Sequence, residues 1–295
     1  VDGVTSTALL YMYLQSHGAN VIYFIPDRIF GYGLNNHDIK KLCDQGVQLI
    51  ITVDNGISAA NEIDFAKSLG IDVVITDHHK VPEKLPNAVA VVDPHRQDCP
   101  SQFKFYAGVG VTFKLVCALE GTMSNLDDLL DEYSDLVAIG TTSDIVPLVD
   151  ENRFLVQCGM QKMQTGLRPG IKELLDLAGV LSQPLNSTNI TFNLFPRINA
   201  AGRIDLADKA VQMLITDDEI EARNYAKYLN NCNIKRKEIE AKIVNTIEEK
   251  LKEDYHHDRI LVVAGENFHA GVIGIVASKL VERFCRPCIV VSIEG

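Results

Sequence analysis

Strand-like and helix-like segments alternate along the first part of this chain, and this alternation constrains its fold more than any other feature. Apolar runs typical of strands occupy residues 21–25, 47–53, 72–76 and 89–92, and residues 58–69 have helical spacing. Strands that alternate with helices form βαβ units, in which helices cover both faces of a parallel sheet. The sequence therefore predicts an α/β fold.

The later part of the chain has a mainly helical pattern before a second α/β pattern begins. Residues 205–253 lack Pro and Gly and carry a stripe of isoleucines at helical spacing, namely Ile234, Ile239, Ile243 and Ile247. The length of this segment indicates a connecting helix. We expect three parts, which are an α/β domain at 1–160, a helical connector at 161–256 and the start of a smaller α/β domain at 257–295.

The composition is that of a globular protein. No apolar run approaches the length that crosses a bilayer, and the seven scattered cysteines favour a reducing cytoplasm. A formal net charge of −11 argues against a nucleic-acid partner unless metal ions neutralise some of the carboxylates. We therefore expect a cytoplasmic protein without a membrane partner.

Polar side chains follow two of the predicted strands at the point where the apolar run stops. Asp54 follows the second run, and the third is followed by Asp77, His78 and His79. Parallel strands place their carboxyl ends at one edge of the sheet, where ligands bind in open α/β folds, so we expect these groups to meet. Taken singly, such an Asp is commonly a turn or cap residue, and a lone His is more often an ordinary hydrogen-bonded residue.

Two further acids can join this group. Asp2 precedes a helix-like run and Asp144 closes another, although either alone could be a turn or cap residue. Carboxylates with one or two imidazoles and no thiolate suit Mn²⁺ or Mg²⁺. Two such ions stabilise the attacking and leaving oxygens when a phosphate ester is cleaved. The cluster therefore favours a metal site suited to that chemistry.

Six motifs, in order along the chain, carry a resemblance to a known family. "VDGVTS", "TVDNG", "TDHH" and "GTTSDIVPL" resemble the successive motifs of the DHH phosphoesterase superfamily. "FPRINAAGR" and "HAGVIGIVASKL" resemble its bacterial exonucleases specific for single-stranded DNA. The resemblance covers essentially the whole chain. It implies a parallel-sheet DHH domain, a long connecting helix and a smaller DHHA1-type α/β domain.

The resemblance also implies an activity and the residues that perform it. The activity is metal-dependent 5′→3′ hydrolysis of single-stranded DNA, in DNA repair and recombination. Asp77 would support a histidine, and His79 would face the scissile phosphate as a charge stabiliser or proton donor. One Mn²⁺ or Mg²⁺ ion would be held by Asp2, Asp54, His78 and Asp144. Asp54 would also reach a second ion.

Four more residues are implied as nucleic-acid contacts, namely Arg197, Asn199, Arg203 and His269. The two arginines would clamp phosphates along the path of the DNA, with Asn199 as a hydrogen-bond partner. Without the resemblance, the arginines would be interpreted as a helix cap and surface charge. His269 would be either a phosphate contact or a cap.

The family's first motif has another Asp two residues before the position of Asp2, and this chain begins after that position. We therefore expect a fragment in which the second metal site is incomplete and the second domain continues beyond Gly295. Two other functions stay open, a DHH phosphodiesterase for short oligonucleotides or cyclic dinucleotides and a catalytically inactive DNA-binding relative. The expected protein is a monomer that works with a helicase or a single-strand-binding protein.

Overall fold

Three parallel strands form the first sheet. The structure is a computed structural model, and it describes residues 1–26, 33–121, 125–183, 185–251 and 259–293. The strands are β1 (Leu49–Val53), β2 (Asp72–Thr76) and β3 (Ala90–Val92). β2 is the central strand and lies between the other two. Val53 pairs with Thr76, and Thr76 pairs with Val92, so the three carboxyl ends lie level with one another.

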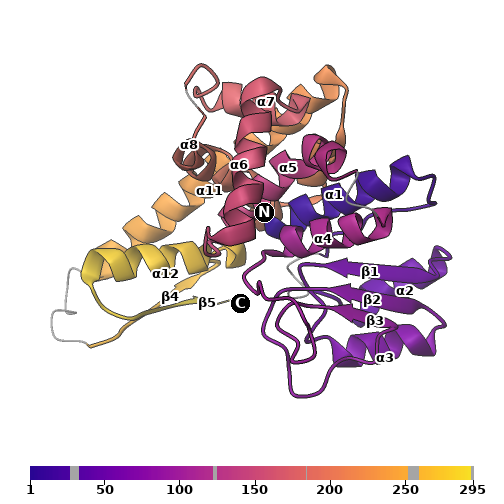
Figure 1. Cartoon of the computed structure of the whole chain (residues 1–295). Helices are drawn as coiled ribbons and strands as arrows, with labels where there is room; N and C mark the ends of the chain where they lie inside the picture. Colours follow the sequence, from indigo (N-terminus) through magenta and orange to yellow (C-terminus); the bar gives the residue numbers. More distant parts are fainter. Residues whose placement is uncertain (27–32, 122–124, 184, 252–258, 294–295) are drawn as a thin grey trace.

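Helices cover both faces of this sheet, as the alternating pattern predicts (Figure 1). Ile50 of β1 packs into one core with α2 (Asn36–Asp44) and α3 (Ala60–Ser68). Val53 of the same strand packs into a second core with α1 (Asp2–Ser16) and α4 (Gly108–Glu120). Successive side chains of a strand point to opposite faces, so β1 contributes to both cores.

The prediction of a strand at residues 21–25 is wrong. These residues belong to no strand, although their side chains alternate in burial. Tyr23 and Ile25 pack against the core beside α1, whereas Ile22 and Phe24 are exposed. An extended segment that lies on a core buries every second side chain whether or not a neighbouring strand pairs with it. The apolar run therefore indicated that this segment lies on a core, but not that it pairs with a neighbouring strand.

Helices dominate the middle of the chain, and they share one hydrophobic core with α1 and α4. These helices are α5 (Leu126–Ser143), α6 (Asp150–Thr165), α7 (Pro169–Leu177), α8 (Ser187–Asn193), α9 (Phe195–Ile204) and α10 (Asp208–Ile215). Residue 160, the expected end of the first domain, lies within α6. The division of the chain into domains stays a prediction.

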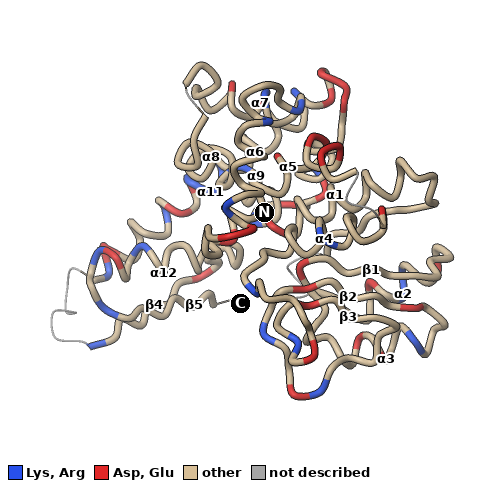
Figure 2. The backbone as a smooth tube through the Cα atoms, in the orientation of Figure 1, with Lys and Arg blue, Asp and Glu red and all other residues tan. Residues whose placement is uncertain are grey.

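The long helix α11 (Glu219–Leu251) connects two hydrophobic cores, as expected of the connector. Ala226 and Leu229 pack into the large helical core, and Ile243 and Ile247 pack into a smaller one. Ile234 was expected on the buried stripe but is 46% exposed. Between the two cores the helix buries polar groups instead, with Asn233 buried and bonded to Arg236. Acidic and basic residues are interspersed along α11 (Figure 2).

The last part of the chain is the second βαβ unit that the sequence predicts. β4 (Leu261–Glu266) and β5 (Cys288–Ile293) pair in parallel, and α12 (Ala270–Phe284) connects them. This unit lies beyond the carboxyl ends of the first sheet in Figure 1. Among the described residues, no helix combines the length and the apolar character needed to cross a membrane.

Candidate metal centre

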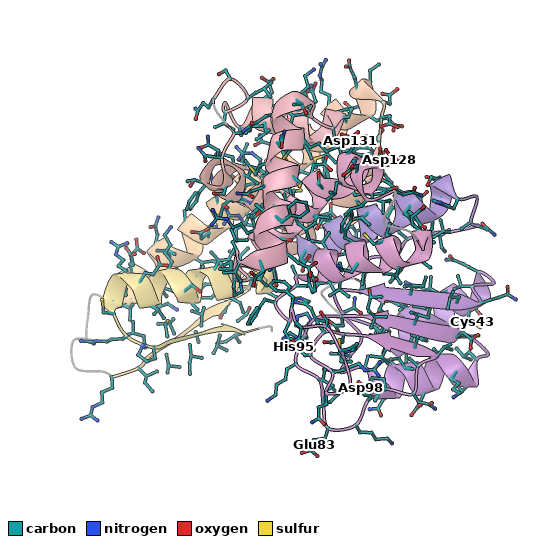
Figure 3. The ribbon with its side chains drawn as sticks, viewed as in Figure 1. Cys43, Glu83, His95, Asp98, Asp128 and Asp131 are labelled. Atoms are coloured by element: carbon teal, nitrogen blue, oxygen red, sulfur yellow. The ribbon has the colours of Figure 1, made fainter. Side chains whose placement is uncertain are left out.

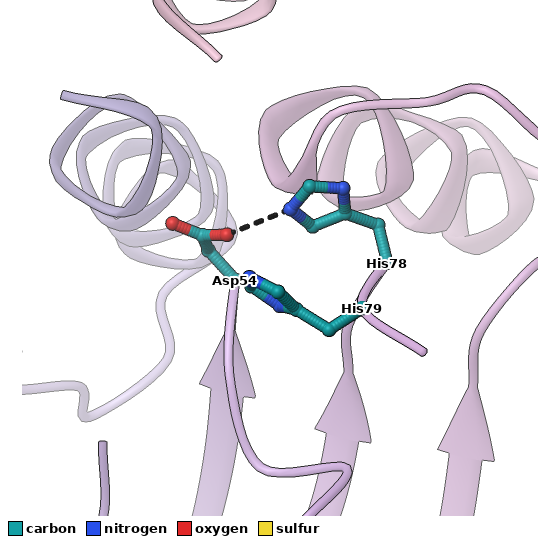
Figure 4. A group of neighbouring side chains, drawn as sticks. All are labelled: Asp54, His78 and His79. Atoms are coloured by element: carbon teal, nitrogen blue, oxygen red, sulfur yellow. Dashed lines mark hydrogen bonds and ion pairs between the residues drawn. The ribbon is translucent and has the colours of Figure 1, made fainter. Parts of the chain in front are cut away.

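The polar residues that follow β1 and β2 meet at the edge of the sheet (Figure 4). Asp54 follows β1 directly and has a left-handed backbone, with φ of 59°. Its Oδ1 atom lies 3.0 Å from Nε2 of His78, which comes two residues after β2. The level ends of two adjacent parallel strands bring these side chains together.

His78 stands at the centre of three carboxylates. Besides its contact with Asp54, its Nε2 atom lies 3.7 Å from Oδ2 of Asp2 and 3.7 Å from Oδ2 of Asp144. The four side chains come from α1, the ends of β1 and β2, and the end of α5. The structure therefore brings together the four residues expected to hold an ion, although they lie far apart along the chain.

Asp2 is fixed by the first turn of α4. The backbone N–H of Gly108 donates to one carboxylate oxygen of Asp2 at 2.6 Å, and that of Val109 donates to the other at 2.8 Å. Free N–H groups at a helix start favour a negative charge. Sequence reasoning missed this role for α4. The sequence signal for this close approach was the glycine at the start of α4. A Cβ on Gly108 would lie 2.6 Å from Cβ of Asp54, so a larger residue would keep the helix start away from the site.

Asp144 reaches the cluster because α5 packs closely against α1. Asp144 caps the carboxyl end of α5, where its N–H donates to the carbonyl oxygen of Gly140 at 3.1 Å. A Cβ on Gly140 would lie only 2.4 Å from Oγ1 of Thr5 on α1. Glycine at this position lets the two helices approach, and the approach carries Asp144 toward Asp2.

Asp77 supports His79 more directly than it supports His78. Its Oδ1 atom lies 2.6 Å from Nδ1 of His79, and its Oδ2 atom accepts from the N–H of Ile57 at 2.9 Å. Only the backbone N–H of His78 reaches Asp77. Asp77 is buried while the His79 side chain is 58% exposed. The pair therefore holds one imidazole in a fixed position at the surface.

The charges in the cluster shift one another's protonation. Burial raises the pKa of Asp2 to about 7, with the neighbouring charge of Asp54 acting in the same direction. Burial opposes a charge on His78, yet the hydrogen bond with Asp54 and the three carboxylate charges raise its pKa to about 9. Burial also raises the pKa of Asp144. The crowded carboxylates favour positive charge at their centre.

This arrangement fits a divalent metal ion. Ligand atoms of Asp2, His78 and Asp144 lie within 4.8 Å of one another, and so do ligand atoms of Asp54, His78 and His79. Carboxylate oxygens with an imidazole nitrogen are a donor set that Mn²⁺ and Mg²⁺ accept. A divalent cation would also relieve the repulsion from Asp54, which adds to burial in raising the pKa of Asp2.

Comparisons with known proteins agree with these motifs. Residues 1–141 match the DHH family, N-terminal domain. The chain is 43% identical over 294 residues to the single-stranded-DNA-specific exonuclease RecJ of Bacillus subtilis, a match that covers 99% of this chain. A crystal structure of exonuclease RecJ bound to manganese matches with a TM-score of 0.85 and 32% identity, over 99% of this chain and 73% of that one. The chain belongs to the RecJ group of the DHH family. The expected family and fold class are thereby confirmed.

The matches with RecJ proteins also show what share of each relative's length this chain covers. It is 41% identical to the RecJ of Escherichia coli over 312 residues, and the match covers 100% of this chain. The chain spans 37% of the B. subtilis protein and 54% of the E. coli protein. A crystal structure of RecJ from Thermus thermophilus in complex with Mn²⁺ matches with a TM-score of 0.82 and 31% identity, over 99% of this chain and 42% of that one.

The RecJ-like motif "FPRINAAGR" forms α9, and Asn199 in the middle of this helix lies beside the metal centre. Asn199 Oδ1 accepts from the amino group of Val1 at 3.1 Å, next to Asp2. Arg197 donates from Nε to Asn230 and from Nη1 to the carbonyl oxygen of Asn193. Burial lowers the pKa of Arg197. Two of its five N–H donors are used in these bonds.

Arg203 and His269 meet where α9 approaches α12. Arg203 donates from Nη1 to the carbonyl oxygen of Gly271 at 3.0 Å. A Cβ on Gly271 would lie 2.2 Å from the carbonyl oxygen of Arg203, so the two backbones are nearly in contact. His269 caps α12 by accepting from the N–H of Gly271 at 3.1 Å. These contacts give both side chains structural partners, and their role in binding nucleic acid stays a prediction.

Proposed function

We propose that this chain carries the catalytic centre of a Mn²⁺- or Mg²⁺-dependent exonuclease that degrades single-stranded DNA from the 5′ end. The observation that carries the proposal is the convergence of Asp2, Asp54, His78 and Asp144 on one point beside the exposed His79. The similarity to RecJ exonucleases supports the choice of substrate. Solved RecJ complexes with Mn²⁺ and Mg²⁺ support the choice of metal.

In this proposal the four converging side chains hold one ion, and Asp54 also faces a second. Bound ions of this kind stabilise the attacking and leaving oxygens of a phosphate ester. The chain's own contribution is to fix the ligands before substrate arrives. The first turn of α4 orients Asp2, and the left-handed backbone turns Asp54 toward His78.

His79 is proposed to stabilise charge on the scissile phosphate or to donate a proton to the leaving oxygen. Asp77 holds Nδ1 of this ring, which leaves Nε2 for the substrate. The hydrogen bond from His79 to Asp77 raises the pKa of His79, so the ring retains its proton more readily at neutral pH. A positioned imidazole of this kind contributes about 10²–10⁴-fold to a rate.

The DNA strand is proposed to pass along α9 toward the start of α12, where Arg197, Asn199, Arg203 and His269 would contact its backbone. Residues 1–160 are then the DHH domain, residues 161–256 the connector and residues 257–295 the start of a DHHA1 domain. We also propose that the protein is a cytoplasmic monomer. A helicase or a single-strand-binding protein would supply its strand.

The test compares substrates for the full-length protein with Mn²⁺. A 5′-labelled single-stranded oligonucleotide should release labelled mononucleotide first, whereas duplex DNA should be degraded slowly. Faster hydrolysis of a dinucleotide or a cyclic dinucleotide would favour the small-substrate phosphodiesterase. Tight DNA binding without release of any product would favour the inactive DNA-binding relative, although the presence of all four converging ligands argues against that outcome.

A further inference from the structure

The turn after β3 repeats the local arrangement that holds His79. β2 is followed by Asp77 and, two residues later, His79, and β3 is followed by Asp93 and, two residues later, His95. The N–H of Asp77 donates to the carbonyl oxygen of Val92, so the two turns lie side by side at the sheet edge. Two imidazoles thus follow adjacent strands in equivalent positions.

Asp93 supports His95 much as Asp77 supports His79. The N–H of His95 donates to Oδ1 of Asp93 at 2.7 Å, and Nδ1 of the ring lies 3.5 Å from the same oxygen. The Asp93 side chain is fully buried, whereas the His95 side chain is 41% exposed. In both pairs a buried carboxylate therefore lies beside an outward-facing imidazole, at 2.6 Å for His79 and at 3.5 Å for His95.

An ordinary turn before Pro94 accounts for only part of this geometry. Such a turn explains the bond from the His95 backbone to Oδ1 of Asp93. It leaves unexplained the other oxygen, Oδ2, which is buried and has no hydrogen-bond partner in the part of the chain that the structure describes. A buried carboxylate oxygen without a partner costs on the order of 1–3 kcal/mol. Among the described residues, the Asp93 carboxylate contacts both the backbone N–H and the ring of His95, so it is tied to that residue.

The other basic side chain of the turn, Arg96, is already occupied. Arg96 donates to Asp98 from Nε at 2.9 Å and from Nη2 as well, and its Nη1 donates back to the carbonyl oxygen of Val91. The guanidinium therefore stiffens the turn. Of the two basic side chains in the turn, His95 is the one left to meet a ligand.

We propose that His95 is a second substrate-contacting imidazole, which donates a hydrogen bond to a phosphate next to the scissile one. This inference rests on the proposed nuclease function and deepens it. Adjacent strands lie about 4.8 Å apart, so the two histidines are spaced to meet neighbouring parts of one DNA backbone. Nδ1 of His95 lies on the side of Asp93, which leaves Nε2 for a phosphate oxygen.

The position of His95 in the molecule agrees with this role. Figure 3 shows His95 at the carboxyl edge of the first sheet, on the side that faces the second βαβ unit. His79 lies just after β2, the neighbouring β-strand. A DNA strand that reaches the metal centre at His79 therefore passes within reach of the end of β3. Asp93 serves as a positioning residue in this scheme, since it acts on the substrate only through His95.

The experiment uses the full-length protein with Mn²⁺ and two variants, His95→Ala and His95→Gln. His95→Ala should raise KM for single-stranded DNA about 10-fold with little change in kcat, because one charge-assisted contact is lost. His95→Gln keeps an N–H donor and should recover part of the lost affinity. His37→Ala, an exposed histidine on α2, is the matched control and should leave KM unchanged.

Oligonucleotides with one neutral methylphosphonate locate the contact. Neutralising the phosphate that His95 meets should weaken wild-type binding by the same factor as His95→Ala, and should weaken His95→Ala no further. Additive losses at every flanking position would overturn the inference, and so would an unchanged KM. A lower kcat and melting temperature at unchanged KM would make His95 a structural residue and also overturn it. Failure of the wild-type protein to cut DNA would instead overturn the proposed nuclease function.

Discussion

At Asp54 one residue combines a ligand role with an unusual backbone. Its carboxylate lies 3.0 Å from His78, and its φ of 59° is a conformation that Asp and Asn tolerate better than most residues. Asn is therefore the substitution that removes the charge without straining the chain. Ala would confound the loss of a ligand with the strain of a left-handed residue.

We expect Asp54→Asn to lower kcat more than about 100-fold and to weaken Mn²⁺ binding, because a charged ligand is lost. In the metal-free variant the loss of the ion pair with His78 offsets the relieved repulsion with Asp2, so the melting temperature should change little. Nuclease assays, calorimetric titration with Mn²⁺ and melting curves measure these effects. Asp128→Ala, at an exposed acid distant from the sheet edge, is the control. Near-normal turnover of Asp54→Asn would contradict the ligand assignment.

Asp77 is expected to affect catalysis through the position of His79. We expect Asp77→Asn to lower kcat about 10- to 100-fold, because the imidazole loses the charged partner that positions it. Binding of Mn²⁺ should change little, since Asp77 lies outside the four converging ligands. The comparison of kcat with Mn²⁺ affinity separates these effects. A parallel loss of both would show that Asp77 acts on His78 instead.

Among the helices, α4 contributes to the site through its first turn. Its N–H groups hold Asp2, and Gly108 leaves room for Asp54. We expect Gly108→Ala to destabilise the protein by about 1–3 kcal/mol, because the new Cβ would displace α4 or Asp54. The nuclease activity of Gly108→Ala should fall together with its stability. Gly166→Ala is the matched control, because no atom lies within 4 Å of the position of its Cβ. Equal melting temperatures for the two variants would refute the close approach.

The contact between α9 and α12 distinguishes two arginines that look alike in sequence. Arg197→Ala should weaken binding of single-stranded DNA by on the order of 1–3 kcal/mol and make the salt slope shallower by about one unit. Arg203→Ala should do the same and also lower the melting temperature, because Arg203 joins α9 to Gly271 of α12. Titrations at several salt concentrations with melting curves test both. Unchanged binding in both variants would leave the arginines with structural roles alone.

At the scale of the whole molecule, the metal centre connects separate parts of the chain. Its ligands belong to α1 and α5 of the large helical core and to the ends of β1 and β2. An ion held by all four stabilises the native state because the unfolded chain lacks the site. Mn²⁺ at 100 times its Kd should add about 2.7 kcal/mol and raise Tm by about 5–10 °C. A chelator should reverse the shift, and Asp54→Asn should reduce it. An unchanged Tm would contradict binding at this place.

The sequence by itself determined features that depend on local patterns. The apolar runs located β1 and β2, and the abrupt change to Asp54 and to Asp77–His79 marked the edge where they meet. The helical spacing of residues 58–69 located α3 (Ala60–Ser68). These predictions succeeded because the two-residue period of a strand and the 3.6-residue period of a helix are written in neighbouring residues.

Only the tertiary structure decided which distant groups come together. Asp2 and Asp144 were plausible as turn or cap residues until the packing at Gly140 brought α5 against α1. The segment at 21–25 had the burial pattern of a strand but belongs to none, and Ile234 lies exposed between two cores on α11. Each of these outcomes depends on what a residue meets across the fold, and a local period carries no information about that partner.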